Sequence, residues 1–243
     1  MNSPGSLTLW QHLEELRKRL LVSLAAVGVV SIAAYACSDL LLGILLRPVA
    51  GAIRELYFFS PAEAFLVKLQ VAFLAGLTAA FPIVASQAWF FVSPGLHERE
   101  KRIVIPAGLV TSVLFAGGAV FCYRIVVPAA VRFFLGMQSE VLRPLISVRE
   151  YVDFLTQLLV AFGVAFNLPV FVMALVFAGV TDAARLGKFR RHAVVLILVA
   201  AAVLTPGPDV ASQFFLAVPL VFLFELSIAA ASLVGFFRKG KKP

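Results

Sequence analysis

Charge is scarce in this 243-residue sequence: 14 % of its residues are Asp, Glu, Lys or Arg, while 61 % are hydrophobic. Soluble proteins carry about 25 % charged and about 45–50 % apolar residues. The shortage of charge therefore excludes an ordinary water-soluble domain and favours a membrane protein. The net charge of +8 would suit nucleic-acid binding. However, the basic residues lie between apolar runs, so we expect no nucleic-acid partner.

Cysteine and histidine are also scarce. Cys37 and Cys122 lie within or beside apolar runs, where a free thiol behaves as a small hydrophobe, and two cysteines make no disulfide framework. His12, His97 and His192 are not spaced as metal ligands. The sequence contains no nucleophile elbow, zinc-protease pattern, phosphate loop or dinucleotide fingerprint. We therefore expect no enzymatic activity, no cofactor and no metal site.

Long apolar runs are what the sequence does contain. A helix needs about 20 apolar residues to cross a hydrocarbon core of roughly 30 Å. The runs predict an all-α, polytopic integral membrane protein, folded as a single membrane-embedded helical domain over residues 1–243. Its six expected transmembrane helices cover residues 20–36, 62–92, 103–131, 151–180, 193–204 and 211–237.

The last two of these helices are expected to be short or irregular. The run at 193–204 has 12 residues, which is about 18 Å of helix at 1.5 Å per residue. A re-entrant hairpin, which does not cross the membrane, would leave the flanking basic residues on the same side as two spanning helices would. Two spanning helices are favoured because the run at 211–237 is long enough to cross by itself.

Local signals mark several helix ends. Ser60 offers a side-chain cap for a helix with Pro61 at its first position and Glu63 at its third, and Ser147 stands at the same distance before Glu150. Residues 205–209 contain two prolines and a glycine, which predict a tight reversal. Four prolines within or near the apolar runs predict helix bends: Pro82, Pro128, Pro169 and Pro219.

The basic residues divide unequally between the two sides of the predicted bundle. Fourteen lie at the termini and in the second-to-third and fourth-to-fifth connections, and seven lie in the opposite segments. Cytoplasmic segments of membrane proteins carry the excess of Lys and Arg. We therefore expect both termini in the cytoplasm.

Polar side chains inside the apolar runs are the first candidates for function. Glu225 lies midway along the sixth run, where an acid costs about 2.5–3.5 kcal/mol on insertion scales. Asn167 lies two residues before Pro169, and Thr205 and Gln213 flank the predicted reversal. Glu225 could simply bond a neighbouring helix, and Asn167 could satisfy carbonyls freed by Pro169. Thr205 and Gln213 could bind a neighbouring helix or, more simply, cap helices. An ion-coupled small-solute transporter using Glu225 is the alternative function, but broken helices in both halves, which it would require, are missing.

Acidic residues in the basic cytoplasmic segments are the second group of candidates. Glu14 and Glu15 precede the basic triplet at 17–19, and Glu98 and Glu100 stand among the basic residues at 99–102. They could be solvated ion-pair partners, which contribute little to stability. Alternatively, some of these carboxylates bind a cationic ligand. Guanidinium forms two parallel bonds with a carboxylate, so such a site would select arginine.

Five segments together resemble the TatC family, the polytopic core subunit of the twin-arginine protein translocase. The segment His12 to Leu20 resembles the family's amino-terminal signature. The others are residues 60–65, residues 91–106, residues 162–170, and residues 204–213 followed by Phe224 and Glu225. The resemblance extends along nearly the whole chain, and the order and spacing of the segments make it specific.

The resemblance implies a receptor in the bacterial cytoplasmic (inner) membrane that binds Arg-Arg signal peptides of folded cargo at the cytoplasmic face. It also implies that the chain scaffolds partner subunits for export driven by the proton-motive force. Implied partners are TatA- and TatB-type single-span subunits, further copies of the chain and membrane lipids. By position, the resemblance assigns residues to three groups. These are signal-peptide binding (Glu15, Arg17, Phe91, Glu100), partner-helix binding (Thr205, Gln213, Glu225) and external loops (Pro48, Asp209).

The sequence departs from the family at Asn167, where the family commonly has glutamate. Asparagine keeps the capacity for hydrogen bonding but cannot ionise. We therefore expect an intramembrane polar role for Asn167 and no proton-coupling role. Gly207 and Pro208 also make the last turn less similar to the family than its flanks are.

Overall fold

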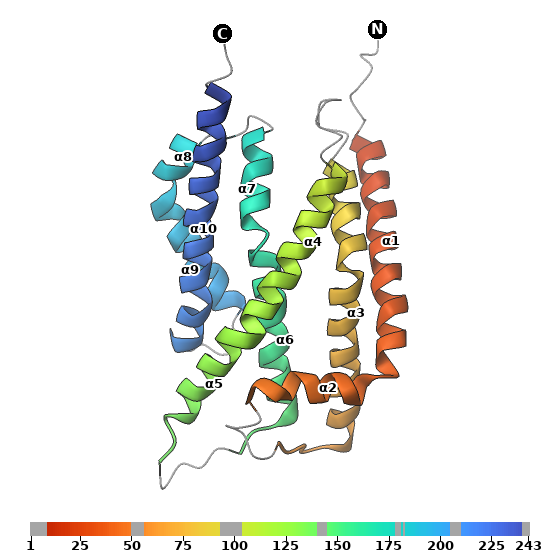
Figure 1. Cartoon of the computed structure of the whole chain (residues 1–243). Coiled ribbons are helices and arrows are strands. Elements are labelled where there is room, and N and C mark those ends of the chain that lie inside the picture. Colours follow the sequence, from red (N-terminus) through yellow and green to blue (C-terminus); the bar gives the residue numbers. More distant parts are fainter. Residues whose placement is uncertain are drawn as a thin grey trace. The chain divides into compact units, whose positions relative to one another are not determined.

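The computed structural model describes residues 9–49, 56–92, 104–139, 145–177, 181, 183–204 and 210–239. In these ranges the chain is built from helices, with one isolated parallel bridge between Tyr57 and Ser147. The prediction of an all-α fold is therefore confirmed. Figure 1 labels the α-helices of this fold. In chain order the elements are α1 (Leu9–Tyr35), α2 (Ser38–Leu46), η1 (Arg47–Val49), α3 (Pro61–Val92), α4 (Val104–Phe121), η4 (Cys122–Val126), α5 (Val127–Leu135), α6 (Val148–Ala165), α7 (Leu168–Phe177), α8 (Ala183–Lys188), α9 (Arg190–Leu204) and α10 (Val210–Lys239).

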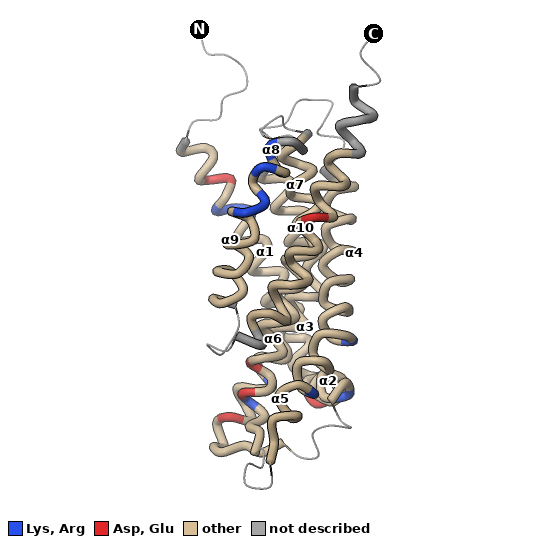
Figure 2. Tube along the Cα trace, turned by 90° about the vertical axis from the view of Figure 1, so that its left-hand side faces the viewer, with Lys and Arg blue, Asp and Glu red and all other residues tan. Residues whose placement is uncertain are grey.

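Five helical segments of the described chain are long and apolar enough to cross a membrane. In Figure 2 the middles of the long helices are mostly free of charged residues, which lie mainly towards the helix ends. The chain is a multi-pass membrane protein. The five segments are Trp10–Tyr35, Pro61–Phe91, Ile105–Leu135, Val148–Val176 and Gln213–Ser232. Helix α9, which corresponds to the fifth predicted helix, has 15 residues and is not among them, so the count of six transmembrane helices stays a prediction.

The structure differs from the predicted helices in two respects. The first helix begins at Leu9 rather than near residue 20, because the polar segment before the apolar run is rich in Leu, Glu, Arg and Lys, which are good helix formers. Helices α2 and α8 were not expected, since runs of nine and six residues are far below spanning length. Residues 178–180 of the predicted fourth helix lie outside the described residues.

Prolines explain two irregularities in the long helices. Pro128 has no N–H for the carbonyl four residues earlier, and the chain just before it forms the π-helical turn η4, in which the Val127 N–H bonds to the Cys122 oxygen. The chain also breaks between α6 and α7, directly before Pro169. Pro82 and Pro219, by contrast, lie inside the continuous helices α3 and α10. Two of the four prolines therefore fall at irregular turns.

The chain divides into two compact units, the first comprising Met1–Leu41 and Lys68–Val113. Its helices α1 and α3 pack closely because small residues face each other: a Cβ on Gly76 would lie 2.0 Å from the Ser31 hydroxyl. The Trp89 indole N–H donates to Thr111 Oγ1 at 3.0 Å, joining α3 to α4. Lys68, which interrupts the apolar run near its start, pairs with Asp39 at 2.7 Å.

The second unit comprises Leu42–Val67 and Leu114–Pro243. In it α10 lies beside α7 and α9 (Figure 1). Two glycines permit close packing of α4 and α6. A Cβ on Gly118 would lie 2.5 Å from the Phe162 carbonyl, and one on Gly163 would lie 2.5 Å from the Phe115 ring. Phe162, which is fully buried, lies at the centre of this contact.

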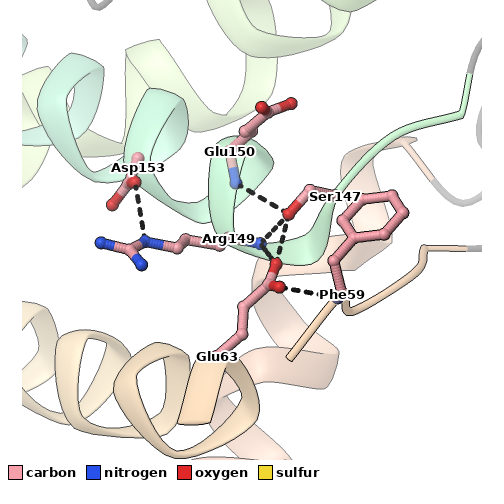
Figure 3. A network of polar contacts seen from close by, with 6 residues as sticks. All are labelled: Phe59, Glu63, Ser147, Arg149, Glu150 and Asp153. Carbon is pink, nitrogen blue, oxygen red and sulfur yellow. Dashed lines mark hydrogen bonds and ion pairs between the residues drawn. The ribbon is translucent and has the colours of Figure 1, made fainter. Parts of the chain in front are cut away.

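A buried carboxylate joins the start of α3 to the start of α6 (Figure 3). Glu63 is 6 % exposed and accepts the Ser147 hydroxyl through Oε1 and the Phe59 N–H through Oε2, the latter at 2.7 Å. Ser147 caps α6 as predicted, accepting the N–H groups of Arg149 and Glu150. At the start of α3 the cap differs from the one expected at Ser60. The Glu63 carboxylate accepts the backbone N–H of Phe59, the residue before Ser60.

Candidate functional site

The amino-terminal end of α1 lies against the carboxyl-terminal end of α3, and polar side chains meet there. Arg19 is at the centre, with its side chain 30 % exposed. Its Nη2 donates to Glu15 Oε1 at 3.2 Å, and its Nη1 donates to Gln87 Oε1 at 3.1 Å. The Arg19 guanidinium carbon also lies 5.3 Å from the centre of the Phe90 ring, a cation–π distance. Helices α1 and α3 therefore fix this guanidinium jointly.

An aromatic pair continues the same contact towards the start of α1. The rings of His12 and Phe91 stack with centroids 4.4 Å apart and planes inclined by 28°. Residues His12, Glu15 and Arg19 stand three and four positions apart, so they share one face of the helix. The six side chains are named the α1–α3 cluster: His12, Glu15, Arg19, Gln87, Phe90 and Phe91.

The structure brings together two of the four residues expected to bind a signal peptide. Glu15 and Phe91 both belong to the α1–α3 cluster, whereas Arg17 is exposed on another part of α1. Glu100 lies outside the described residues. Whether these residues bind a ligand stays a prediction, but a carboxylate and an aromatic ring are available in one cluster.

Sequence reasoning missed Arg19, Gln87 and Phe90. The spacing of Glu15 and Arg19 is the i,i+4 spacing of a helical ion pair, which could have indicated their contact once the helix was extended to Leu9. Nothing in the sequence indicated Gln87, because its role depends on how α3 packs against α1.

The Glu15 carboxylate of the α1–α3 cluster can accept further hydrogen bonds. An ionised Glu offers about four lone-pair sites, and Arg19 uses one through a single oxygen of Glu15. The Glu15 side chain is 23 % exposed, so a ligand can reach it from solvent. Within the described chain Arg19 Nε is buried without a hydrogen-bond acceptor. The arrangement can accept a second donor group.

The polar residues predicted on the last two helices have partners within the chain. The Gln213 amide donates from Nε2 to the Leu198 carbonyl at 2.8 Å, joining α10 to α9. Glu225 Oε2 accepts from Arg190 Nη2 at 2.8 Å. Thr205 and Asp209 lie outside the described residues. Because Glu225 has a cation beside it, the structure gives no support to a transporter in which this acid binds a solute or ion.

Asn167 occupies the break between α6 and α7. Its side-chain Nδ2 donates to the Gly163 carbonyl at 2.8 Å, and its backbone N–H bonds to Val164 instead. The side chain therefore satisfies a carbonyl that the irregular turn leaves open, which is the structural role that sequence reasoning considered. Asn167 Oδ1 is buried without a donor in the described part of the chain.

Two further expectations concern an external loop and metal binding. Pro48, expected in an external loop, lies in the short helix η1 (Arg47–Val49). Among the described residues no group of three or more His, Cys, Asp and Glu side chains is placed to hold a metal ion.

Comparisons with known proteins agree on one family. The family model described as Sec-independent protein translocase protein (TatC) matches residues 11–219. A protein of that name from Carboxydothermus hydrogenoformans is 39 % identical over 228 residues, covering 94 % of each chain. One from Campylobacter jejuni is 39 % identical over 236 residues, covering 95 % of this chain and 96 % of its own.

Solved structures of similar fold belong to the same family. A crystal structure of the twin arginine translocase receptor TatC superposes with a TM-score of 0.83 at 36 % identity, covering 90 % of this chain and 99 % of its own. A second crystal structure of this receptor gives a TM-score of 0.82 over 91 % of this chain and 98 % of its own. By sequence and by fold, this chain belongs to the TatC family of Sec-independent protein translocase proteins.

Proposed function

We propose that this chain is the core receptor subunit of the twin-arginine translocase. It binds Arg-Arg signal peptides of folded proteins at the cytoplasmic face and scaffolds single-span partner subunits of the TatA and TatB type. Export across the bacterial cytoplasmic membrane then uses the proton-motive force. Family membership supports the general role, and the α1–α3 cluster supports the location of the signal site.

The observation that carries this proposal is the Glu15 carboxylate, held half-buried in a basic segment beside an aromatic pair. A signal arginine would donate to the second oxygen of Glu15, and Glu100 would take the second arginine. The adjoining apolar residue of the signal would pack against Phe91. Paired guanidinium groups suit this chemistry because each can form two parallel bonds to a carboxylate.

Crosslinking tests the proposal directly. A photoreactive signal peptide with adjacent arginines should crosslink to the wild-type chain, and crosslinking should fall at least tenfold in Glu15→Gln and in Glu100→Lys. Glu14→Gln is the matched control, because Glu14 is an exposed neighbour of the same type. Undiminished, arginine-dependent crosslinking in both acidic-site variants would show that these carboxylates are not the receptor.

The same proposal fixes the orientation of the chain. The α1–α3 cluster must face the cytoplasm, where signal peptides arrive, so the amino terminus is cytoplasmic, and with the six proposed spans the carboxyl terminus lies on the same side. The excess of basic residues on that side agrees with this orientation. In a chain whose Cys37 and Cys122 are both replaced by alanine, a cysteine replacing the exposed Lys18 should react with a membrane-impermeant maleimide only in inverted vesicles. Reaction in intact cells would contradict the orientation.

Partner helices are proposed to dock along α9 and α10, near Thr205, Gln213 and Glu225. Polar groups inside a bilayer favour hydrogen bonds to neighbouring helices, each contributing about 0.6–2 kcal/mol. Gln213 already donates to Leu198, so its side-chain oxygen is the atom available to a partner. Further copies of this chain and membrane lipids complete the proposed assembly.

A further inference from the structure

An apolar groove runs along the second unit of the chain, between residues 121–133 and the start of α10. Its volume is about 560 Å³, and all nine residues that line it are apolar. Phe214 and Val218 on α10 are each more than half exposed, so the described chain leaves the groove open at its surface. The lining includes Phe121, Ile125, Ala129 and Phe133 on one side and Phe214 and Val218 on the other. This surface is named the α5–α10 groove.

The size of the groove favours a hydrocarbon chain over a helix as its occupant. The groove lies inside the spans Ile105–Leu135 and Gln213–Ser232, so lipid or another apolar helix must cover it, because an empty groove would lose dispersion contacts. From residue 121 to residue 133 it is about 18 Å long at 1.5 Å per residue, close to the about 15 Å of one leaflet. Its volume over this length gives a mean cross-section of about 30 Å², whereas a helix about 10 Å across needs about 80 Å². An acyl chain can therefore lie in the groove, whereas a helix can only lie across it.

A cation stands at the end of the groove nearest to the membrane surface. Arg132 precedes the lining residue Phe133, in the last turn of α5 and three residues before the span ends at Leu135. Its side chain is exposed, and among the described residues no acid pairs with it. Long basic side chains at this depth extend to the headgroup layer. The anion available to Arg132 there is a lipid phosphate.

The acid beside α5 on helix α6 already has a partner. Helix α6 contacts α5 through the rings of Phe154 and Phe134, whose centroids lie 6.3 Å apart. Asp153 precedes this contact and pairs with Arg149 at 3.8 Å. Arg132 is therefore free to bind an anion from outside the described chain.

We propose that the α5–α10 groove is a binding site for an anionic glycerophospholipid. The lipid phosphate contacts the Arg132 guanidinium, and one acyl chain lies in the groove from Phe133 towards Phe121. Guanidinium suits this ligand because it can form two parallel bonds to a phosphate, and basic pockets between membrane helices bind anionic headgroups. The inference is independent of signal-peptide binding, because the groove shares no residue with the α1–α3 cluster.

Photolabelling with two matched lipids tests the site. The full-length chain would be placed in phosphatidylcholine nanodiscs that contain a small fraction of a probe with a diazirine at the end of one acyl chain. The probe is phosphatidylglycerol, which is anionic, or phosphatidylcholine with the same chains, which is not. The measured quantity is the ratio of phosphatidylglycerol to phosphatidylcholine labelling at residues 121–133 and 214–219, mapped by mass spectrometry. We expect about fivefold, which is the attraction of one basic residue near the surface to anionic lipid.

One pair of variants tests the headgroup contact. In Arg132→Gln the labelling ratio should fall below twofold, because the cation at the end of the groove is lost. Arg149→Gln is the matched control: it removes the same charge from α6, but this arginine pairs with Asp153 and does not line the groove. Its ratio should equal that of wild type. A wild-type ratio below twofold, or a ratio in Arg132→Gln that has not fallen by at least half, would overturn the inference.

A second pair of variants tests the acyl-chain contact and does not depend on Arg132. Ala129→Phe places a ring inside the groove, because Ala129 is exposed and lines it. Labelling of residues 121–133 by both probes should fall at least threefold. Val120→Phe adds the same ring at an exposed position of α4 outside the lining and should leave the labelling unchanged. Undiminished labelling in Ala129→Phe would show that no acyl chain lies in the groove.

A partner helix is the other possible occupant, and crosslinking detects it. If a cysteine replacing Ala129 crosslinks to a single-span subunit while neither lipid probe labels the groove, the groove is covered by a helix and the inference is overturned. Labelling by phosphatidylglycerol that depends on both Arg132 and the open groove supports the lipid site.

Discussion

Arg190 and Glu225 form an ion pair that ties the first turn of α9 to a position well inside α10, with 2.8 Å between Nη2 and Oε2. Helix α9 is short for a membrane helix, with 15 residues. The pair fixes one end of α9 against α10, and the bond from Gln213 to Leu198 fixes a position nearer its other end. The apolar part of α9 is too short to fix by itself how deep the helix lies in the membrane. These two polar contacts therefore hold α9 in place against α10.

Removing the cation of this pair should destabilise the protein more than removing both charges. In Arg190→Gln the Glu225 carboxylate loses its partner within an apolar run, and we expect the free energy of unfolding to fall by about 2–3 kcal/mol. The double variant Arg190→Gln/Glu225→Gln should lose less, because no unpaired charge remains. Thermal unfolding in detergent measures both, with the exposed Arg191→Gln as control. A loss in the double variant as large as that in Arg190→Gln would argue against a coupled pair.

The buried Glu63 carboxylate should be essential for joining α3 to α6. Glu63→Ala removes the acceptor for the Phe59 N–H and the Ser147 hydroxyl at once, and buried groups without partners are costly. We expect the thermal midpoint to fall by several degrees. Glu150→Gln, an exposed acid in the same network (Figure 3), should change it little. Equal midpoints for the two variants would show that the network does not contribute to stability.

Composition and periodicity predicted the long helices of this fold because a spanning helix needs only length and apolarity. They could not place the short helices α2 and α8, since such segments are stabilised by what they pack against. The start of α1 was also missed. A search for apolar runs does not detect a helix whose first turns are polar, such as the segment from Trp10 to Arg19.

The candidate site was predictable only in part for a related reason. Glu14 and Glu15 were conspicuous in the sequence as acids beside a basic triplet, and the resemblance to the TatC family singled out Glu15. Its ion pair with Arg19 and the bond from Arg19 to Gln87 depend on the packing of α1 against α3. The partners of Glu225 and Gln213 were hidden in the same way, because α9 and α10 had to be placed beside each other first.

Adjacent glycines in α4 provide a test of close helix packing. A Cβ on Gly118 would lie 2.5 Å from the Phe162 carbonyl, whereas one on Gly117 would have no heavy atom within 4 Å. Gly118→Ala should therefore lower the free energy of unfolding by about 1–3 kcal/mol through overpacking. Gly117→Ala should be neutral or stabilise by up to about 1 kcal/mol through helix propensity. Thermal unfolding of the two variants decides this, and similar losses would contradict the packing argument.

Contact with partner helices can be tested at the surface of α10. A cysteine replacing Gln213 should crosslink to cysteine-bearing single-span Tat subunits, because its position offers a polar contact in an otherwise apolar surface. A cysteine replacing Val113, which is exposed on α4, serves as a control for random collisions in the bilayer. Equal crosslinking from both positions would mean that the partner does not dock at Gln213.

Loss of the Gln213 side-chain oxygen gives a second measure of the same contact. Gln213→Leu should reduce recovery of the single-span subunits with the chain by severalfold, since the hydrogen-bonding oxygen is lost. Loss of the bond to Leu198 alone could also loosen α9, so the thermal midpoint of Gln213→Leu must be measured beside the recovery. A severalfold loss of recovery with an unchanged midpoint assigns the effect to the partner contact, whereas full recovery would contradict it.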